Sequence, residues 1–223
     1  FPLCSHAETH FEAAQRLMQA GQETEARRAL KLEVGTRPAN LEARFNLAVL
    51  LERIGHDDEA VILYRVNMKR GRHLPSVVNL SAWLRNHGQN REAETLLKQA
   101  TQDFRSEAVP WYLLAEMAQE KGNDKQASSF FKRAIKADKK NGFAHLRYAR
   151  FLAINKPGTE AVIHARSAVR LLPTCAPCLN IAGDIFAKAG EKKQALVVWQ
   201  KSIAIAPDAA LRSKILHAQN ITP

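Results

Sequence analysis

Long apolar runs and the motifs of common enzymes are missing from this 223-residue sequence. No run of about 18 apolar residues occurs, so no segment of the sequence is predicted to span a membrane. There is no glycine-rich phosphate loop, no His-Glu-x-x-His pair and no Gly-x-Ser-x-Gly turn. His6 and His10 are four residues apart beside Cys4, a spacing that suits metal ligands, but they lie at an end of the chain that is expected to fray; the other six histidines are scattered along the chain. We therefore predict that the protein is not an enzyme, with no catalytic residues, no metal and no cofactor.

Cysteine is scarce as well, and two of the three cysteines form the motif Cys175-Ala-Pro-Cys178. No predicted strand precedes this motif, which argues against a thioredoxin-like site. The next residue is Leu179 rather than histidine, which argues against covalent haem attachment. Two interpretations stay open: a pair of small residues at a turn between helices, or a local disulfide if the compartment is oxidising.

What the sequence does contain is one helical hairpin repeated along the chain. Residues 108–141 show it most clearly, as two short amphipathic helices that break at Lys121-Gly122-Asn123-Asp124. Gly122 suits the left-handed conformation that ends a helix, and Asp124 is predicted to cap the next helix. The turn positions recur at steps of 34, 33, 34, 34 and 34 residues: Gly21, Gly55, Gly88, Gly122, Lys156 and Gly190.

Each turn is followed at the same steps by a small residue, which lets two antiparallel helices approach closely. These residues are Ala26, Ala60, Ala93, Ala127, Ala161 and Ala195. Four positions later comes an apolar residue that is predicted to fill the space between neighbouring hairpins: Leu30, Tyr64, Leu97, Phe131, Ala165 or Trp199. A single hairpin cannot bury its apolar face alone, so stacked neighbours must build the core.

This spacing resembles the tetratricopeptide repeat over residues 7–209. The fourth unit carries the clearest match: Trp111, Leu114, Ala115, Ala118, Gly122, Ala127, Phe131 and Ala134. The resemblance implies an all-α fold, a right-handed superhelical solenoid of antiparallel helix hairpins. The fifth unit departs from the pattern, because Lys156-Pro157-Gly158 replaces its turn glycine.

The repeat phase divides the chain into a tail at residues 1–6, six repeats, and a capping helix and tail at 210–223. The repeats are predicted at 7–40, 41–73, 74–107, 108–141, 142–175 and 176–209. The expected helices outside the fourth unit span 7–20, 22–36, 41–53, 57–70, 77–86, 91–101, 143–154, 159–171, 177–188, 192–205 and 209–219. In the last of these, Leu211, Ile215 and Leu216 are expected to face inward and cover the end of the array.

Basic residues outnumber acidic ones, and the formal net charge is +11. Residues 7–107 hold 15 Lys and Arg against 14 Asp and Glu, whereas residues 108–209 hold 16 against 8. Five basic residues share an outward phase of the second helices: Lys31, Arg65, Lys98, Lys132 and Arg166. We interpret them as a solvated ridge, with binding to an acidic partner as the alternative. No nucleic acid is expected, because no aromatic residue interleaves with the basic stripe.

In tetratricopeptide proteins the first helix of every repeat lines a concave groove that commonly holds an extended or helical peptide. The resemblance points to nine partner-binding candidates: Phe11, Phe45, Asn46, Asn79, Tyr112, Glu116, Arg147, Arg150 and Asp184. Aromatic side chains offer buried area and the asparagines can pair with a peptide backbone. Arg147 and Arg150 are placed to hold an acidic group. The alternative is that Phe11, Phe45 and Tyr112 pack between adjacent hairpins.

The amino end resembles the tail of an apolar targeting segment, with a small-x-small cleavage site at Ser5-His6-Ala7. We therefore expect an exported protein, periplasmic or envelope-associated, with a cytoplasmic location as the alternative. The predicted function is a scaffold that binds a protein or peptide partner, in a bacterial pilus, secretion or exopolysaccharide-export assembly. Two alternatives stay open: a repeat module of a larger enzyme such as a glycosyltransferase, and a scaffold that self-associates.

Overall fold

The computed structural model describes residues 8–220, and these residues form thirteen helices and no strand. The predicted tail at 1–6 lies outside the described residues. In chain order the helices are α1 His10–Gln19, α2 Glu23–Thr36, α3 Leu41–Arg53, α4 Asp57–Arg70, α5 Leu74–Asn86, α6 Asn90–Asp103, α7 Val109–Glu120, α8 Asp124–Ala137, α9 Gly142–Asn155, α10 Thr159–Leu171, α11 Ala176–Lys188, α12 Lys192–Ile205 and α13 Ala209–Asn220.

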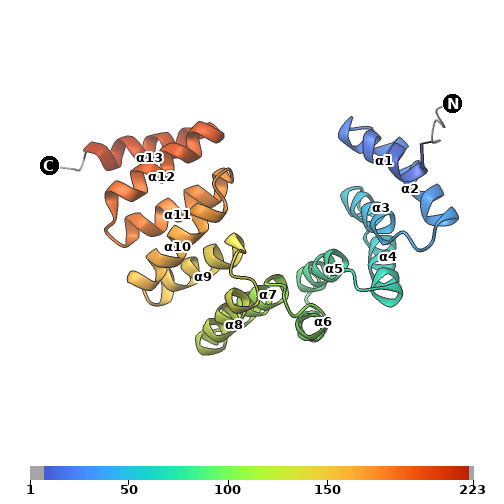
Figure 1. Ribbon diagram of the computed structural model, residues 1–223, viewed down its shortest axis with the longest axis horizontal. Coiled ribbons are helices and arrows are strands. Elements are labelled where there is room, and N and C mark those ends of the chain that lie inside the picture. The colour runs from blue at the N-terminus through green and yellow to red at the C-terminus, as the bar shows by residue number, and fades with distance from the viewer. Residues whose placement is uncertain (1–7, 221–223) are drawn as a thin grey trace, which may run out of the picture. The chain divides into compact units, whose positions relative to one another are not determined.

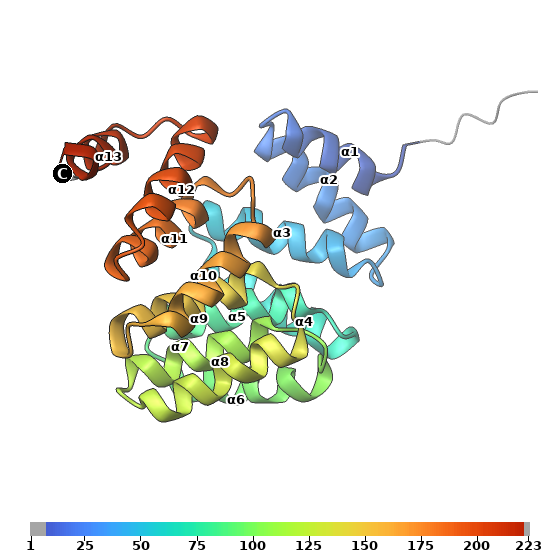
Figure 2. The ribbon, with the colours of Figure 1, turned by 60° about the vertical axis from the view of Figure 1, so that its left-hand side comes forward.

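Consecutive helices pair as hairpins, from α1 with α2 to α11 with α12, and α13 packs on α12 (Figures 1 and 2). The chain divides into two compact units. Unit 1 ends at Asp103 and holds α1–α6, and unit 2 begins at Phe104 and holds α7–α13. Each unit therefore contains three hairpins. The all-α prediction and the predicted hairpin repeat are confirmed.

Left-handed glycines end the first helix in five of the six hairpins, as the sequence predicted. Gly21, Gly55, Gly88, Gly122 and Gly190 have φ between 71° and 82°. In the fifth hairpin, α9 runs on to Asn155 and Gly158 directly precedes α10. The predicted cap Asp124 is wrong. Asn123 caps α8, because its side-chain Oδ1 accepts the Gln126 backbone N–H at 3.1 Å, and Asp124 is the first residue of the helix.

The repeat alanines form the contact between the two helices of each hairpin. All six are at most 1% exposed, and the residues four positions later are at most 4% exposed, which confirms both predictions. In the sixth hairpin this packing also needs a glycine. A Cβ at Gly183 would come within 2.4 Å of the Trp199 ring, so a side chain there requires the Trp199 ring to move.

Two predicted helix starts are wrong because capping residues were overlooked. α1 begins at His10 rather than at residue 7, since Thr9 and Glu12 form a reciprocal capping box. α5 begins at Leu74 rather than at Val77. His73 accepts the Ser76 backbone N–H through its ring nitrogen at 3.2 Å, and Pro75 is tolerated in the first turn of a helix.

The terminal helix α13 covers the last hairpin with one narrow stripe. Leu211 and Ile215, one turn apart, are 2% and 5% exposed, as predicted. The prediction for Leu216 is wrong: it is 61% exposed. One residue advances a helix by about 100°, so Leu216 turns away from the surface that Ile215 contacts.

The predicted basic ridge is exposed at all five positions, and some of its members pair with the second helix of the next hairpin. Arg65 contacts Glu92 at 2.7 Å, and Arg166 donates to Gln194 at 2.9 Å.

Within residues 8–220, none of the helices combines the length and the apolar character needed to cross a bilayer.

Candidate functional site

The candidate residues of unit 1 are engaged by their own unit. Phe45 packs against Tyr64, with ring centroids 5.9 Å apart, and against His73 at 5.3 Å. The Asn79 side-chain amide donates to the Tyr64 hydroxyl at 3.1 Å, and that hydroxyl donates to Glu52 at 2.5 Å. Burial raises the pKa of Tyr64 far above its ordinary value, so the phenol stays protonated and keeps both bonds.

Phe11 on α1 and Asn46 on α3 are partly buried, and the structure gives neither a side-chain hydrogen bond or ring contact among the described residues. The aromatic candidates of unit 1 thus serve packing at least at Phe45, which was the alternative that the sequence left open.

Three candidates of unit 2 form one cluster between the first helices α7 and α9. Arg147 on α9 makes an ion pair with Glu116 on α7 and lies over the Tyr112 ring, 4.7 Å from its centroid. Tyr112 is 9% exposed, and burial raises the pKa of its phenol. The aromatic face and the carboxylate hold the Arg147 guanidinium in one orientation.

Beside this cluster lies an open cleft of about 430 Å³, which we call the α7–α9 cleft. Its lining is Glu116, Gln119, Glu120, Phe131, Arg147, Arg150 and Phe151. Two arginines and two glutamates surround two phenylalanines, a mixture that suits a peptide with both apolar and charged groups. The residues that sequence reasoning missed lie one turn along from predicted ones, so extending each helical face by one turn would have found Gln119, Glu120 and Phe151.

Arg150 differs from Arg147 in being exposed, and it forms no hydrogen bond or ion pair with the rest of residues 8–220. It lines the α7–α9 cleft and also a second opening of about 240 Å³ toward α11, together with Ile181 and Asp184. The guanidinium therefore stands between two hollows of unit 2 with its donors available.

Asp184, the last candidate, is engaged by helices that follow it. Its carboxylate accepts from the Trp199 indole N–H at 3.0 Å and from Lys214 at 2.6 Å. Lys214 comes from α13 and also lies over the Trp199 ring, 5.2 Å from its centroid. Lys214 therefore ties α13 to α11, a contact that the helical pattern of the sequence does not predict.

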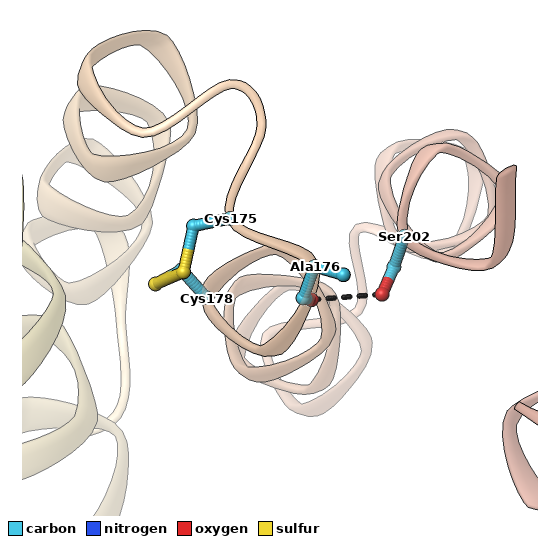
Figure 3. The surroundings of a disulfide bond; sticks show 4 residues. All are labelled: Cys175, Ala176, Cys178 and Ser202. Carbon is cyan, nitrogen blue, oxygen red and sulfur yellow. Dashed lines mark hydrogen bonds between the residues drawn. A yellow bond between two sulfur atoms is a disulfide. The ribbon is translucent and has the colours of Figure 1, made fainter. Parts of the chain in front are cut away.

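The cysteine pair forms a disulfide at the junction of α10 and α11 (Figure 3). Of the two interpretations of the Cys175-Ala-Pro-Cys178 motif, the structure therefore supports the local disulfide. Cys175 is the N-cap residue of α11 and Cys178 is buried in its first turn. Next to it, the Ser202 hydroxyl donates to the Ala176 carbonyl at 2.8 Å and joins α11 to α12 (Figure 3).

Comparison with known proteins shows which solved structures share this fold. A family model described as tetratrico peptide repeat matches residues 41–135. A chain of the APC/C hetero-tetramer Cut9-Hcn1 superposes with a TM-score of 0.69 at 18% identity, over 96% of this chain and 43% of that one. This protein thus spans less than half the length of that relative. No curated protein matches the sequence.

Two further solved structures match over most of both chains. PilW, described as a widely conserved type IV pilus biogenesis factor, superposes with a TM-score of 0.69 at 15% identity, over 93% of this chain and 96% of PilW. YrrB, described as a TPR protein with an unusual peptide-binding site, gives a TM-score of 0.51 at 19% identity, over 86% and 98% of the two chains. Such identities show a shared fold. With the family match over residues 41–135 and thirteen helices that fit about six repeats and a terminal helix, the described residues have the fold of a tetratricopeptide repeat solenoid.

Proposed function

We propose that this protein is a non-enzymatic scaffold that binds a peptide segment of a protein partner in the α7–α9 cleft. The observation that carries the proposal is Arg150, an exposed guanidinium at the edge of the cleft with no partner in the described part of the chain. Elsewhere in the cleft, Arg147 is neutralised by Glu116. A carboxylate on the bound peptide would give Arg150 the bidentate partner that guanidinium groups favour.

The rest of the cleft supports a peptide rather than a small polar molecule. Phe131 and Phe151 provide an apolar floor, and Gln119 offers both donors and acceptors for a peptide backbone. Tyr112 is too buried to contact a ligand broadly, and its role in this proposal is to orient Arg147. The bound segment would thus carry an apolar side chain close to an acidic one.

The cellular setting that we propose is a bacterial envelope assembly, with the protein in the periplasm. Two observations support it. The fold is shared with a type IV pilus biogenesis factor over nearly the full length of both chains. The Cys175–Cys178 disulfide is of a kind that persists in oxidising compartments.

Charge reversal at Arg150 tests the proposal. Proteins retained from native extract by the wild-type chain would be compared with those retained by Arg150→Glu and by Arg212→Glu, which makes the same change on the exposed face of α13. We expect at least one partner to be lost with Arg150→Glu and kept with Arg212→Glu. If both variants retain the same partners as the wild type, the α7–α9 cleft is not the binding site.

A further inference from the structure

Unit 2 has a second hollow, formed by the second helices of its last two hairpins. We call it the α10–α12 cleft: Arg166 and Val169 of α10, Phe186 of α11, and Lys193, Gln194, Val197 and Val198 of α12. Its volume is about 280 Å³. α10 and α12 each pack on α11 (Figures 1 and 2). Phe186 of α11 lines the cleft and is 1% exposed, so it forms the floor. None of these residues lines the α7–α9 cleft, so the two hollows can be tested separately.

The rim of the α10–α12 cleft exposes apolar side chains that the repeat does not require. Val197 is 51% exposed, and Ile163, one turn before Arg166 on α10, is 53% exposed. Both stand two residues after a repeat alanine. The third and fourth repeats have Thr95 and Ser129 at that position, so hairpin packing is satisfied by a polar residue there. The last two repeats thus carry an exposed aliphatic side chain at a position where packing does not require one; the second repeat also has one there, Ile62, at 60% exposed.

The charges around the cleft have one predominant sign. α10 and α12 carry five basic residues: Arg166, Arg170, Lys192, Lys193 and Lys201. Their one acidic residue, Glu160, accepts a hydrogen bond from the Tyr148 hydroxyl at 3.1 Å. Glu191, at the N-cap of α12, is engaged by Arg166 at 3.6 Å and by Gln194 at 2.9 Å. The cleft therefore presents an apolar floor inside a positive rim.

We propose that the α10–α12 cleft docks an acidic amphipathic segment of a partner protein. One leucine- or phenylalanine-sized side chain of that segment enters above Phe186 between Val169 and Val197. Its flanking Asp and Glu side chains face Lys193 and the basic residues of α10. A concave hollow with a buried floor accepts one inserted side chain, whereas a lipid surface would need a continuous apolar face without such a hollow. This surface is independent of the peptide cleft proposed above.

The test uses a synthetic helical peptide of about 16 residues, with leucine at helical i, i+3, i+4 and i+7 spacing and glutamate elsewhere. A twin peptide with every glutamate replaced by lysine controls for charge. Binding to the full chain is followed by amide NMR shifts. The variants are Val197→Asp and Lys193→Glu. The matched controls are Ile62→Asp, an exposed aliphatic residue at the same repeat position in unit 1, and Lys192→Glu, the exposed neighbour outside the cleft.

We expect the acidic peptide to shift residues of α10 and α12, and both cleft variants to weaken it about tenfold or more, because each removes an apolar or charged contact. Ile62→Asp and Lys192→Glu should bind as the wild type does. The proposal is overturned if the acidic peptide does not bind, if the lysine twin binds equally well, or if the cleft variants bind unchanged. Binding to vesicles of phosphatidylglycerol and phosphatidylcholine without binding to the peptide would also overturn it. Because Lys193 is fully on the surface, its variant keeps the test valid if Val197→Asp unfolds.

Discussion

The two units build their interiors from different side chains, although they share one repeat. Unit 1 buries a polar network between α3, α4 and α5. Arg44 is 2% exposed and donates to the Asn67 side chain at 2.9 Å, while Asn67 donates to the Leu41 carbonyl at 2.8 Å and to Ser76 at 3.1 Å. Desolvation lowers the pKa of Arg44, yet an arginine stays charged at neutral pH, so this network holds a buried cation.

Unit 2 is packed with aromatic rings instead. Phe131 lies 5.5 Å from Tyr148 and 5.3 Å from Phe151, measured between ring centroids, and Trp199 fills the space above Gly183. The buried polar side chains of its described part are His145 and Ser202, against six in that of unit 1. Its stability should therefore depend on shape and buried area rather than on paired polar groups.

The difference shows how a repeat tolerates a change of period. The step between the second and third turn glycines is 33 residues instead of 34, and the network of Arg44, Asn67 and Ser76 lies at this joint. Hydrogen bonds require defined directions, so we expect this network to restrict the packing of the two hairpins where the usual spacing is lost. In unit 2 every step is 34 residues, and apolar packing suffices.

The largest effect is expected from removing the side-chain acceptor of the buried cation of unit 1, which leaves Arg44 with the Pro38 carbonyl as its acceptor. Asn67→Leu should lower the free energy of unfolding by about 3–5 kcal/mol, because the Arg44 charge stays buried without this partner. Urea unfolding followed by circular dichroism measures the loss, and hydrogen exchange should locate it in α3–α5. The double variant Arg44→Met/Asn67→Leu should lose less than Asn67→Leu alone. An additive loss in the double variant would show that the pair is not coupled.

A loss of similar size, about 3–5 kcal/mol, is expected in unit 2 for Phe131→Ala, because it opens a cavity beside the rings of Tyr148 and Phe151. The matched control is Phe130→Ala, its neighbour on α8, which is partly buried and packs on Trp111. Thermal unfolding should rank the two variants clearly. Equal losses at both positions would contradict the assignment of Phe131 to the core of unit 2.

A smaller effect, about 1–3 kcal/mol, is expected for Gly183→Ala, since the new methyl group must displace the Trp199 ring. The displaced indole would also weaken its hydrogen bond to Asp184. Trp199 fluorescence reports on this directly: its emission should shift in Gly183→Ala but not in Gly190→Asn, a change in an open turn. An unchanged spectrum would mean that the contact is looser than described.

The smallest effect is a dependence of unit 2 on pH through a histidine pair. His145 Nδ1 lies 2.9 Å from His164 Nδ1, and His145 Nε2 lies 3.2 Å from the Lys139 carbonyl. Because a carbonyl only accepts, the proton of neutral His145 sits on Nε2, and its Nδ1 accepts from His164. Burial lowers the pKa of both imidazoles, with Arg170 adding to this at His145, and with His145 and Lys132 adding to it at His164. The hydrogen bond to the Lys139 carbonyl, and then Asp138, oppose the lowering of the pKa at His145, and Glu160 opposes it at His164.

The direction of the pH dependence of stability follows from the difference between the histidine pKa values of the folded and unfolded chains. The unfolded chain takes up these protons near the ordinary histidine pKa of about 6.5, while the folded chain resists them to lower pH. The pair's contribution is therefore fully present above about pH 6.5 and declines as the pH falls below it. Between pH 8 and pH 5, the free energy of unfolding should decline less steeply in His164→Gln than in the wild type. In His217→Gln on α13 it should decline as steeply as in the wild type. Equal slopes in all three proteins would exclude the pair as the cause.

The sequence predicted the architecture well because periodic features carry it. The turn glycines and the repeat alanines are local requirements of a helical hairpin, so spacing alone locates them. Helix starts such as Thr9 and His73 were missed because a cap depends on one side chain reaching one backbone N–H. The candidate residues could not be separated from the sequence for a similar reason. Asn79 and Arg150 occupy groove positions of the third and fifth repeats, but only Asn79 is hydrogen-bonded by its neighbours. Which neighbours a residue contacts depends on the three-dimensional structure, and its position within the repeat does not predict it.

The two units also differ in how their groove candidates are used. In unit 1, Phe45 and Asn79 are used within the unit, whereas in unit 2 Arg150 remains available. The most direct measurement is hydrogen exchange of the full chain, free and with a partner retained by the wild type. We predict added protection in α7 and α9, lost in Arg150→Glu. Protection confined to α3 and α5, and unaffected by Arg150→Glu, would contradict the account.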